Sequence, residues 1–267
     1  MFLPSKQYIK NNSLQRKNAE DTCNTYIQRM VWKSNEIILD IGCGPGDVTS
    51  DILYPLLMKN INQLIGVDKS IEMVEYAKKT YECSKMGFEV LDIENVNDCS
   101  FYSNRFNKIF SFFCFHWIHN KPDTLCNLHL MLKNGGEMLI NFLLINPFAE
   151  LYTSLDAEWQ KYVKDIKKMF HNLYSQDEIR DIFIKAGFRV INLESSIKKY
   201  SFSDLPTFLN YIKAVDDMYT LLPEQSHNRY FVHVKEKLCK TQAVEICPIT
   251  GMITFSYTPI TVHAIKD

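Results

Sequence analysis

Three acidic residues, Asp40, Asp68 and Asp92, each follow a short apolar run in the first hundred residues of the chain. If those runs are parallel strands, their carboxyl ends meet at one edge of a sheet, where α/β folds bind ligands. There Asp40 could engage an ammonium group, directly or through water. Asp68 could accept hydrogen bonds from both hydroxyls of a ribose, and Asp92 could reach the exocyclic amine of an adenine. An amino-acid cation, a ribose and an adenine occur together in S-adenosylmethionine, which the three acids therefore predict as the ligand.

The first of these acids, Asp40, lies within a glycine-rich segment, ILDIGCGPGDVTSDIL (38–53). Its Gly42, Gly44 and Gly46 fall where the first strand would turn into a helix, so that the backbone can approach a ligand closely. The GxGxxG pattern of dinucleotide-binding proteins would place a glycine at position 47, where this chain has Asp47. A carboxylate there disfavours a pyrophosphate, so a nicotinamide-dependent dehydrogenase is the least favoured function.

The segment FSFFCFHWIHN (110–120) has the composition of a buried strand up to about Phe115 and then ends in two polar-edged rings, His116 and Trp117. A tryptophan at the end of a strand is often a packing residue, but its Nε1–H can also donate to a ligand while its ring walls an apolar pocket. His116 could orient a neighbouring group or be a structural imidazole. The phenylalanines of the segment are expected in the core, with one of them facing the adenine or the sulfonium.

Strand and helix patterns alternate through the first 145 residues, and these elements would position the residues described above. Short apolar runs predict strands at 36–42, 64–68, 87–92, 106–115 and 137–145. Helical spacing predicts helices at 13–30, 47–58, 71–81 and 122–132. Ser70 would cap the third helix, and Asn134, Gly135 and Gly136 would terminate the fourth. This alternation is typical of an α/β protein with a doubly wound parallel sheet.

The pattern changes after Pro147. Helices are predicted at 148–170, 175–186, 204–219 and 223–240, and strands at 188–200 and 252–266. The last strand would complete the sheet as its one antiparallel member, and the helices would form a cap inserted over the substrate. Because no flexible linker or repeat divides the chain, we predict a single domain over residues 1–267. Its first part, 1–146, would bind the cofactor, and 147–267 would supply the cap and the final strands.

Composition argues against several kinds of partner. The net charge of −1, without long runs of like charge, argues against binding to nucleic acid. The longest apolar stretch, MLINFLLI (138–145), is far shorter than the roughly 20 residues of a membrane span. The first residues, MFLPSKQYIKNN, lack the apolar core of a signal peptide. The eight cysteines form no CxxC pair, so neither a zinc site nor a redox motif is expected. These features predict a reduced, metal-free, cytoplasmic protein.

Five sequence blocks together resemble those of the insect juvenile hormone acid O-methyltransferases, a family of class I S-adenosylmethionine-dependent methyltransferases. The blocks are SLQ (13–15), DIGC (40–43), VLDIE (90–94), FSFFCFHWI (110–118) and NGGE (134–137). Their spacing also resembles that of the family, whereas beyond about residue 150 only the length and the helix–strand order match. The resemblance implies a Rossmann-like doubly wound sheet, S-adenosylmethionine as the cofactor and a homodimer.

The resemblance also assigns roles to individual residues. Gln15 and Trp117 correspond to the pair that hydrogen-bonds the carboxylate of the acceptor in the family, and His116 lies beside Trp117 as a third candidate catalytic residue. The cofactor-binding residues that it implies are Asp40, Gly42, Cys43, Gly44, Asp68, Lys69, Met73, Asp92, Ile93 and Phe113.

The implied reaction converts the carboxylate of a small apolar acid, such as juvenile hormone acid, farnesoic acid or a fatty acid, to its methyl ester. A carboxylic acid has an unperturbed pKa of about 4 and is ionised at pH 7, so this in-line displacement needs no general base. It needs the oxygen held roughly 3 Å from the methyl carbon, with water excluded. Neutral donors such as Gln15 and Trp117 can orient a carboxylate and leave it nucleophilic. Two alternatives stay open: a methyltransferase for a small amine or hydroxyl acceptor, and a catalytically silent relative that only binds the cofactor.

Overall fold

The main sheet of the protein contains seven strands in the computed structural model, which describes residues 5–145, 147–169, 174–216 and 218–267. Their order is β3-β2-β1-β4-β5-β9-β6. The strands are β1 (Glu36–Ile41), β2 (Ile61–Asp68), β3 (Met86–Val90), β4 (Phe106–Phe112), β5 (Leu132–Ile145), β6 (Phe188–Ser195) and β9 (Ile253–Lys266). Strands β1 to β5 are parallel, and β9 runs antiparallel between β5 and β6. The predicted doubly wound sheet with one antiparallel strand is therefore confirmed.

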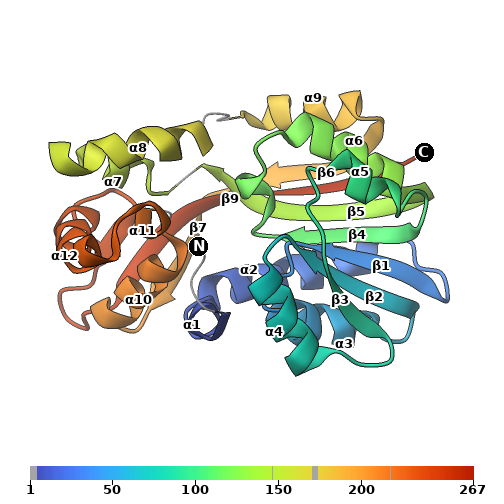
Figure 1. Ribbon diagram of the computed structural model, residues 1–267, viewed down its shortest axis with the longest axis horizontal. Helices are drawn as coiled ribbons and strands as arrows, with labels where there is room; N and C mark the ends of the chain where they lie inside the picture. The colour runs from blue at the N-terminus through green and yellow to red at the C-terminus, as the bar shows by residue number, and fades with distance from the viewer. Residues whose placement is uncertain (1–4, 146, 170–173, 217) are drawn as a thin grey trace.

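Helices cover both faces of this sheet (Figure 1). One face packs against α2 (Ser13–Tyr26), η2 (Thr49–Leu53), α3 (Tyr54–Leu57) and α4 (Ile71–Tyr81). The other packs against α5 (Val96–Ser100), α6 (Lys121–Met131) and α9 (Gln176–Lys185). Strands β1 and β4 are buried along almost their whole length, which explains their nearly continuous apolar sequences.

Local capping signals set the ends of two helices where the sequence predicted them. The Ser70 side chain accepts a hydrogen bond from the Met73 amide at the start of α4. Ser175 and Glu178 form a reciprocal capping box at the start of α9. Just beyond the end of α9, Gly187 adopts a left-handed conformation with a φ of 94° and turns the chain into β6.

The remaining elements form a cap beyond one end of the main sheet, at the left of Figure 1. They are α7 (Ala149–Ser154), α8 (Ala157–Met169), β7 (Lys198–Phe202), α10 (Leu205–Val215), α11 (Met218–Leu221), α12 (His227–Leu238) and β8 (Val244–Ile246). The long strand β9 links the cap to the main sheet, because its first residues pair with β7 and β8 and its later residues pair with β5 and β6. The cap therefore contains a small antiparallel sheet besides the predicted helices.

Two predictions, one at the carboxyl end of β4 and one at the amino end of β5, are wrong. The strand predicted at 106–115 ends at Phe112, because Phe113 adopts a left-handed backbone conformation with a φ of 51°. Residues Phe115–Trp117 then form the 3₁₀ turn η3. Residues 134–136 do not terminate a helix but lie within β5, where Gly135 has a φ of 72° and the pairing with β4 is irregular.

The cap also departs from the prediction in detail. The helix predicted at 148–170 is broken into α7 and α8 by Leu155, whose backbone is extended, and residue 170 lies outside the described residues. The predicted strand at 188–200 is two strands, β6 and β7. The helix predicted at 204–219 ends at Val215, and the one predicted at 223–240 begins only at His227. Aromatic and aliphatic patterns revealed these segments but not their breaks.

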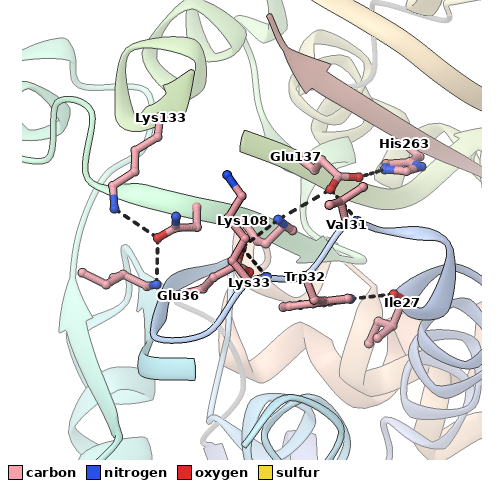
Figure 2. Close-up of polar contacts among 11 residues, drawn as sticks. Ile27, Val31, Trp32, Lys33, Glu36, Lys108, Lys133, Glu137 and His263 are labelled. Carbon is pink, nitrogen blue, oxygen red and sulfur yellow. Dashed lines mark hydrogen bonds and ion pairs between the residues drawn. The ribbon is translucent and has the colours of Figure 1, made fainter. Parts of the chain in front are cut away.

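A buried cluster of charges lies at the amino-terminal ends of the parallel strands. Lys108 Nζ lies 3.3 Å from Glu36 Oε1 and 3.5 Å from Glu137 Oε1. The Glu137 carboxylate also accepts from the Val31 amide at 2.8 Å and lies 2.7 Å from His263 Nε2 (Figure 2). Because the carboxylates hold the backbone between α2 and β1, the cluster helps to fix the position of α2.

Two observations bear on the environment of the protein. All eight cysteines fall within the described ranges, and each is a free thiol. In the described part of the chain, none of the helices has both the length and the apolar composition of a membrane span.

Candidate functional site

A cavity of about 780 Å³ lies where the carboxyl ends of the parallel strands face the cap. Its wall draws on the ends of β1, β2 and β5, on the segments that follow β3 and β4, on α2, and on the cap. Eleven of the predicted site residues line it: Gln15, Gly42, Gly44, Asp68, Lys69, Met73, Asp92, Ile93, Phe113, His116 and Trp117. Asp40 and Cys43 do not. The structure thus brings the residues predicted for the cofactor and for the acceptor into one space.

The loop after β1 contains glycine for two different reasons. Gly42 has a φ of 68°, and a Cβ on it would lie 2.2 Å from Cys114 Sγ. Gly44 has a φ of 53° and lines the cavity, and no atom beyond its chain neighbours lies within 4 Å of where its Cβ would be. The loop therefore leaves a cradle of accessible backbone in which a ligand can lie against the main chain.

Asp68 is the last residue of β2 and Asp92 follows β3, so in the strand order β3-β2-β1 both carboxylates lie on the same side of the glycine loop. The Asp68 carboxylate accepts from the Gly44 amide at 3.0 Å and from the Ser70 amide at 2.8 Å. Burial raises the pKa of Asp68 above its ordinary value, although these backbone hydrogen bonds act in the opposite direction. Asp92 Oδ1 accepts from the Glu94 amide at 3.0 Å, while Asp92 itself is exposed to the cavity. Each carboxylate keeps acceptor capacity for hydroxyl or amine donors of a ligand.

Asp40 and Cys43 lie behind the cavity wall. Asp40 is buried, and its carboxylate accepts a hydrogen bond from Thr49 Oγ1 at 2.6 Å. Burial raises the pKa of Asp40 to about 7, with smaller contributions from the charges of Asp68 and Asp47. Burial also raises the pKa of the Cys43 thiol well above its ordinary value. Their predicted contact with the cofactor stays a prediction, and the geometry gives Asp40 a structural contact with the helix after the glycine loop.

A turn after β4 brings His116 and Trp117 to the cavity. Phe113 leaves the strand with its positive φ, and its amide donates to the Asn141 carbonyl at 2.8 Å. A positive φ is unfavourable for a bulky residue and is found where the surrounding structure enforces it. The Phe113 ring then contacts the His116 ring edge-on at 6.0 Å, and the His116 and Trp117 rings lie 5.0 Å apart.

The His116 ring is held in one tautomer. Its Nδ1 accepts from the Leu143 amide at 3.4 Å, so the proton of the neutral ring lies on Nε2. Burial, together with the charge of Lys121, lowers the pKa of His116 to about 3. His116 is therefore neutral at physiological pH, a poor general base, and able to donate one hydrogen bond from Nε2.

Gln15 enters the cavity from α2. Its side chain is buried, and its Oε1 has no hydrogen-bond partner among the described residues. Arg16, the next residue, donates to Asp47 Oδ2 at 2.6 Å, and Asn12 donates to the same oxygen at 2.9 Å. These contacts hold α2 against the helix that follows the glycine loop. A polar group that is buried without a partner, beside a cavity, is suited to bind a polar ligand.

The cavity is also lined by residues that the sequence did not single out. Tyr8, on α1 (Ser5–Ile9), lines the cavity, and burial raises the pKa of its hydroxyl. Cys114 follows Phe113, and burial raises its pKa to about 12, which leaves it an unreactive thiol. The cap contributes Phe148, Tyr211, Lys213, Ala214, Val215, Asp216, Tyr219, Leu222, Glu224, His227 and Asn228. No spacing marks these cap residues in the sequence, because they come from the start of α7, the end of α10, the segment around α11 and the start of α12.

Metal ligands are not gathered here. Within the described ranges, no group of three or more His, Cys, Asp or Glu side chains is placed to hold a metal ion. The described wall of the cavity offers backbone amides, carboxylates, neutral hydrogen-bond donors and apolar side chains.

Residues 32–187 match the family model of a methyltransferase domain. The chain is 30% identical to the juvenile hormone acid O-methyltransferase of Drosophila melanogaster over 233 residues, which cover 84% of this chain and 78% of that protein. It is 29% identical to the Bombyx mori protein of the same name over 216 residues, which cover 78% of this chain and 77% of that protein. Among solved structures, phosphoethanolamine N-methyltransferase 2 of Haemonchus contortus, in complex with S-adenosylhomocysteine, has a TM-score of 0.54 at 22% identity. That superposition covers 92% of this chain and 52% of the other. At this level of identity, the structural likeness shows that the two proteins share a fold.

Proposed function

Because this chain belongs to the class I methyltransferases, and among them to the family of the juvenile hormone acid O-methyltransferases, we propose that it transfers a methyl group from S-adenosylmethionine to the carboxylate of an apolar acid. The proposal combines two parts of one cavity, an acidic edge for the cofactor and a set of neutral donors for the acceptor.

The acidic edge suits S-adenosylmethionine. The accessible backbone at Gly44 and the carboxylates of Asp68 and Asp92 lie on the same side of the cavity, where they can hold the polar parts of a nucleoside. When bound, this cofactor supplies an electrophilic methyl group on a positively charged sulfur. The Phe113 and Tyr8 rings, which line the same space, present apolar and electron-rich surfaces suited to a cation.

The observation that carries the proposal is the placement of Gln15, His116 and Trp117 around the same cavity as the cofactor residues. Each supplies a neutral donor: an amide NH₂, an imidazole Nε2–H and an indole Nε1–H. Neutral donors can orient a carboxylate oxygen without the strong charge-assisted pairing of an arginine, so the oxygen stays nucleophilic. Since the acceptor is already ionised, the residues need only position it and exclude water.

Apolar and aromatic side chains of the cavity wall support an apolar acceptor. They include Leu143, Phe148, Tyr211, Val215 and Leu222, and the same wall also contains Lys213, Asp216 and Glu224. A cavity of about 780 Å³ is within the usual size range of small-molecule sites, and here it must hold a nucleoside and the acceptor together. Juvenile hormone acid, farnesoic acid and medium-chain fatty acids are of the right class, because each has one carboxylate on an apolar chain.

The state of His116 argues against an acceptor that must lose a proton. Methylation of a hydroxyl, or of a protonated amine, needs a base poised near the operating pH. The pKa of His116, lowered to about 3, makes it a weak base. A small amine or hydroxyl acceptor is therefore the less supported alternative.

The test is to incubate the folded protein with methyl-labelled S-adenosylmethionine and a panel of isoprenoid acids, fatty acids, amines and alcohols. We expect labelled methyl esters from the acids and no product from the amines and alcohols. Tight cofactor binding without transfer to any acceptor would instead indicate a catalytically silent relative.

A single substitution separates a carboxylate acceptor from an amine. Gln15→Glu keeps the shape of the side chain but places a negative charge beside the acceptor. For an acid we expect kcat/KM to fall at least about 100-fold, because juxtaposed like charges cost several kcal/mol. For an amine the added charge would be neutral or favourable. Gln28→Glu, at an exposed position beyond the end of α2, is the matched control and should change nothing.

A further inference from the structure

A carboxylate is built into the part of the cavity wall that the cap provides. Asp216 lies between α10 and α11, is only 4% exposed, and lines the cavity. Its Oδ1 accepts from the Tyr152 hydroxyl and from the Met218 amide, both at 3.0 Å, and its Oδ2 accepts from the Tyr230 hydroxyl at 2.8 Å. These three donors fix its orientation, so the position of the charge is set by the fold rather than by the ligand.

The contacts that the structure describes for Asp216 come from two hydroxyls and an amide and not from a cation. Its three partners are neutral, and burial raises its pKa to about 6, so it is mostly ionised above pH 7. Lys213, which also lines the cavity, has its ammonium 4.0 Å from the centre of the Phe231 ring. Among apolar neighbours such as Val215 and Leu222, a fixed negative charge acts over a longer range than it would in water.

The proposed acceptor carries a negative charge at one end only. The neutral groups of Gln15, His116 and Trp117 can donate hydrogen bonds to that charged end. The cap wall, with Asp216 in it, opposes a charge of the same sign. A second carboxylate at the far end of the acceptor would lie against this wall and be repelled by Asp216.

We propose that Asp216 determines specificity, by excluding acceptors with a second carboxylate and by directing the single carboxylate of an apolar acid to Gln15, His116 and Trp117. This inference rests on the proposed function. It adds the residue through which an acceptor with a negatively charged far end is rejected. Selectivity of this kind is gained through repulsion of the wrong ligand rather than through contacts with the right one.

The experiment compares dodecanoic acid, dodecanedioic acid and 12-hydroxydodecanoic acid at pH 8, as ligands by calorimetry in the presence of S-adenosylhomocysteine and as substrates. Asp216→Asn removes the charge and keeps the shape, and its amide can still pair with both tyrosines. We expect Asp216→Asn to improve the binding of the diacid relative to the monoacid at least tenfold. The hydroxy acid, which is polar but uncharged, should change less than threefold relative to the monoacid.

Two comparisons make the result specific. Glu236→Gln makes the same charge change at an exposed position on α12 and should leave the diacid-to-monoacid ratio unchanged. Should Asp216→Asn not fold, Asp216→Ser removes the charge and leaves a hydroxyl for Tyr230.

An unchanged ratio in the Asp216 variant, or equal binding of diacid and monoacid by the wild type, would overturn the inference. Absence of methyl transfer to dodecanoic acid, with a ratio that still depends on Asp216, would count against the proposed function alone. Binding and turnover thus report on the two proposals separately.

Discussion

Arg16 Nη1 donates to Asp47 Oδ2 at 2.6 Å, and this contact joins the helix that contains Gln15 to the end of the glycine loop. Arg16 follows Gln15 on α2, and Asp47 follows the glycine loop. Asp47 is 2% exposed and also accepts from Asn12. At the position where a dinucleotide-binding loop would have glycine, this chain therefore has an anchor for α2. The acid that disfavours a pyrophosphate is the one that positions Gln15.

Replacement of Arg16 by Met should disturb the acceptor more than the cofactor. It leaves the buried Asp47 carboxylate with Asn12 as its remaining side-chain donor and frees α2 to shift. We expect the KM for the acid to rise at least about tenfold, with the cofactor Kd within threefold. Loss of one partner of a partly buried pair should also lower the free energy of unfolding by about 1–3 kcal/mol.

The control for Arg16→Met is Lys17→Met, which removes the neighbouring cation but only breaks exposed pairs with Glu20 and Asp21. It should leave KM and stability within error of the wild type. Steady-state kinetics and urea unfolding measure both quantities. An unchanged acid KM in a folded Arg16→Met protein would show that the pair does not position Gln15.

Trp117→Phe should reduce acid methylation and spare cofactor binding. The substitution keeps an aromatic wall but removes the Nε1–H that we propose as a donor to the acceptor carboxylate. One lost hydrogen bond to a charged group corresponds to about 1.5–3 kcal/mol, or roughly 10- to 150-fold in kcat/KM. Calorimetry with S-adenosylhomocysteine should give an unchanged Kd. Retention of full activity would mean that Trp117 serves packing alone.

That Asp68 and Asp92 line one cavity could be predicted from the sequence, because both positions follow from local patterns. Asp68 ends β2 and Asp92 follows β3, and the parallel order of the sheet brings them to one edge. Phe113 shows where such reasoning stops. Its positive φ ends β4 early and is enforced by packing and by the hydrogen bond to Asn141, neither of which a pattern of apolar residues reveals.

The presence of Gln15 in the cavity wall could be predicted only through the family resemblance. Gln15 carries no signal of its own, since a glutamine on an N-terminal helix would by default be solvated. Asp216 interrupts the helix predicted at 204–219, and its partners Tyr152 and Tyr230 are distant in the sequence. Contacts of this kind depend on how α7, α10 and α12 pack, so they emerge only from the tertiary structure.

Substitutions at His116 should affect the rate without changing its pH dependence. The pKa of His116 is lowered to about 3, so the imidazole is neutral between pH 5 and 9 and does not titrate in that range. His116→Gln keeps a neutral donor and should retain kcat/KM within about threefold, whereas His116→Leu should lose about tenfold. The pH profiles of both should parallel that of the wild type. A wild-type inflection that disappears in either variant would instead identify His116 as an acid–base group.

Asp40→Asn should stabilise the protein at alkaline pH. The pKa of Asp40 is about 7 in the folded protein, against an ordinary value of 3.8, so the folded state holds the proton more tightly than the unfolded chain. The contribution of this group to stability is therefore full below about pH 4 and is lost as the pH rises towards 7. The Asn variant lacks this loss. We expect equal or lower stability than the wild type at pH 5, and a relative gain of roughly 1–4 kcal/mol on moving to pH 8.

Urea unfolding of the protein without cofactor measures this difference, and Asp181→Asn, at an exposed position on α9, is the control that should show no such pH dependence. The same variant tests the role predicted for Asp40 in cofactor binding. If the ionised carboxylate engages the ammonium group of S-adenosylmethionine, through water across the cavity wall, then Asp40→Asn should weaken the cofactor at least tenfold at pH 8. A variant that gains stability but binds the cofactor as tightly as the wild type would identify Asp40 as a structural acid that holds Thr49, and would leave cofactor binding to Gly44, Asp68 and Asp92.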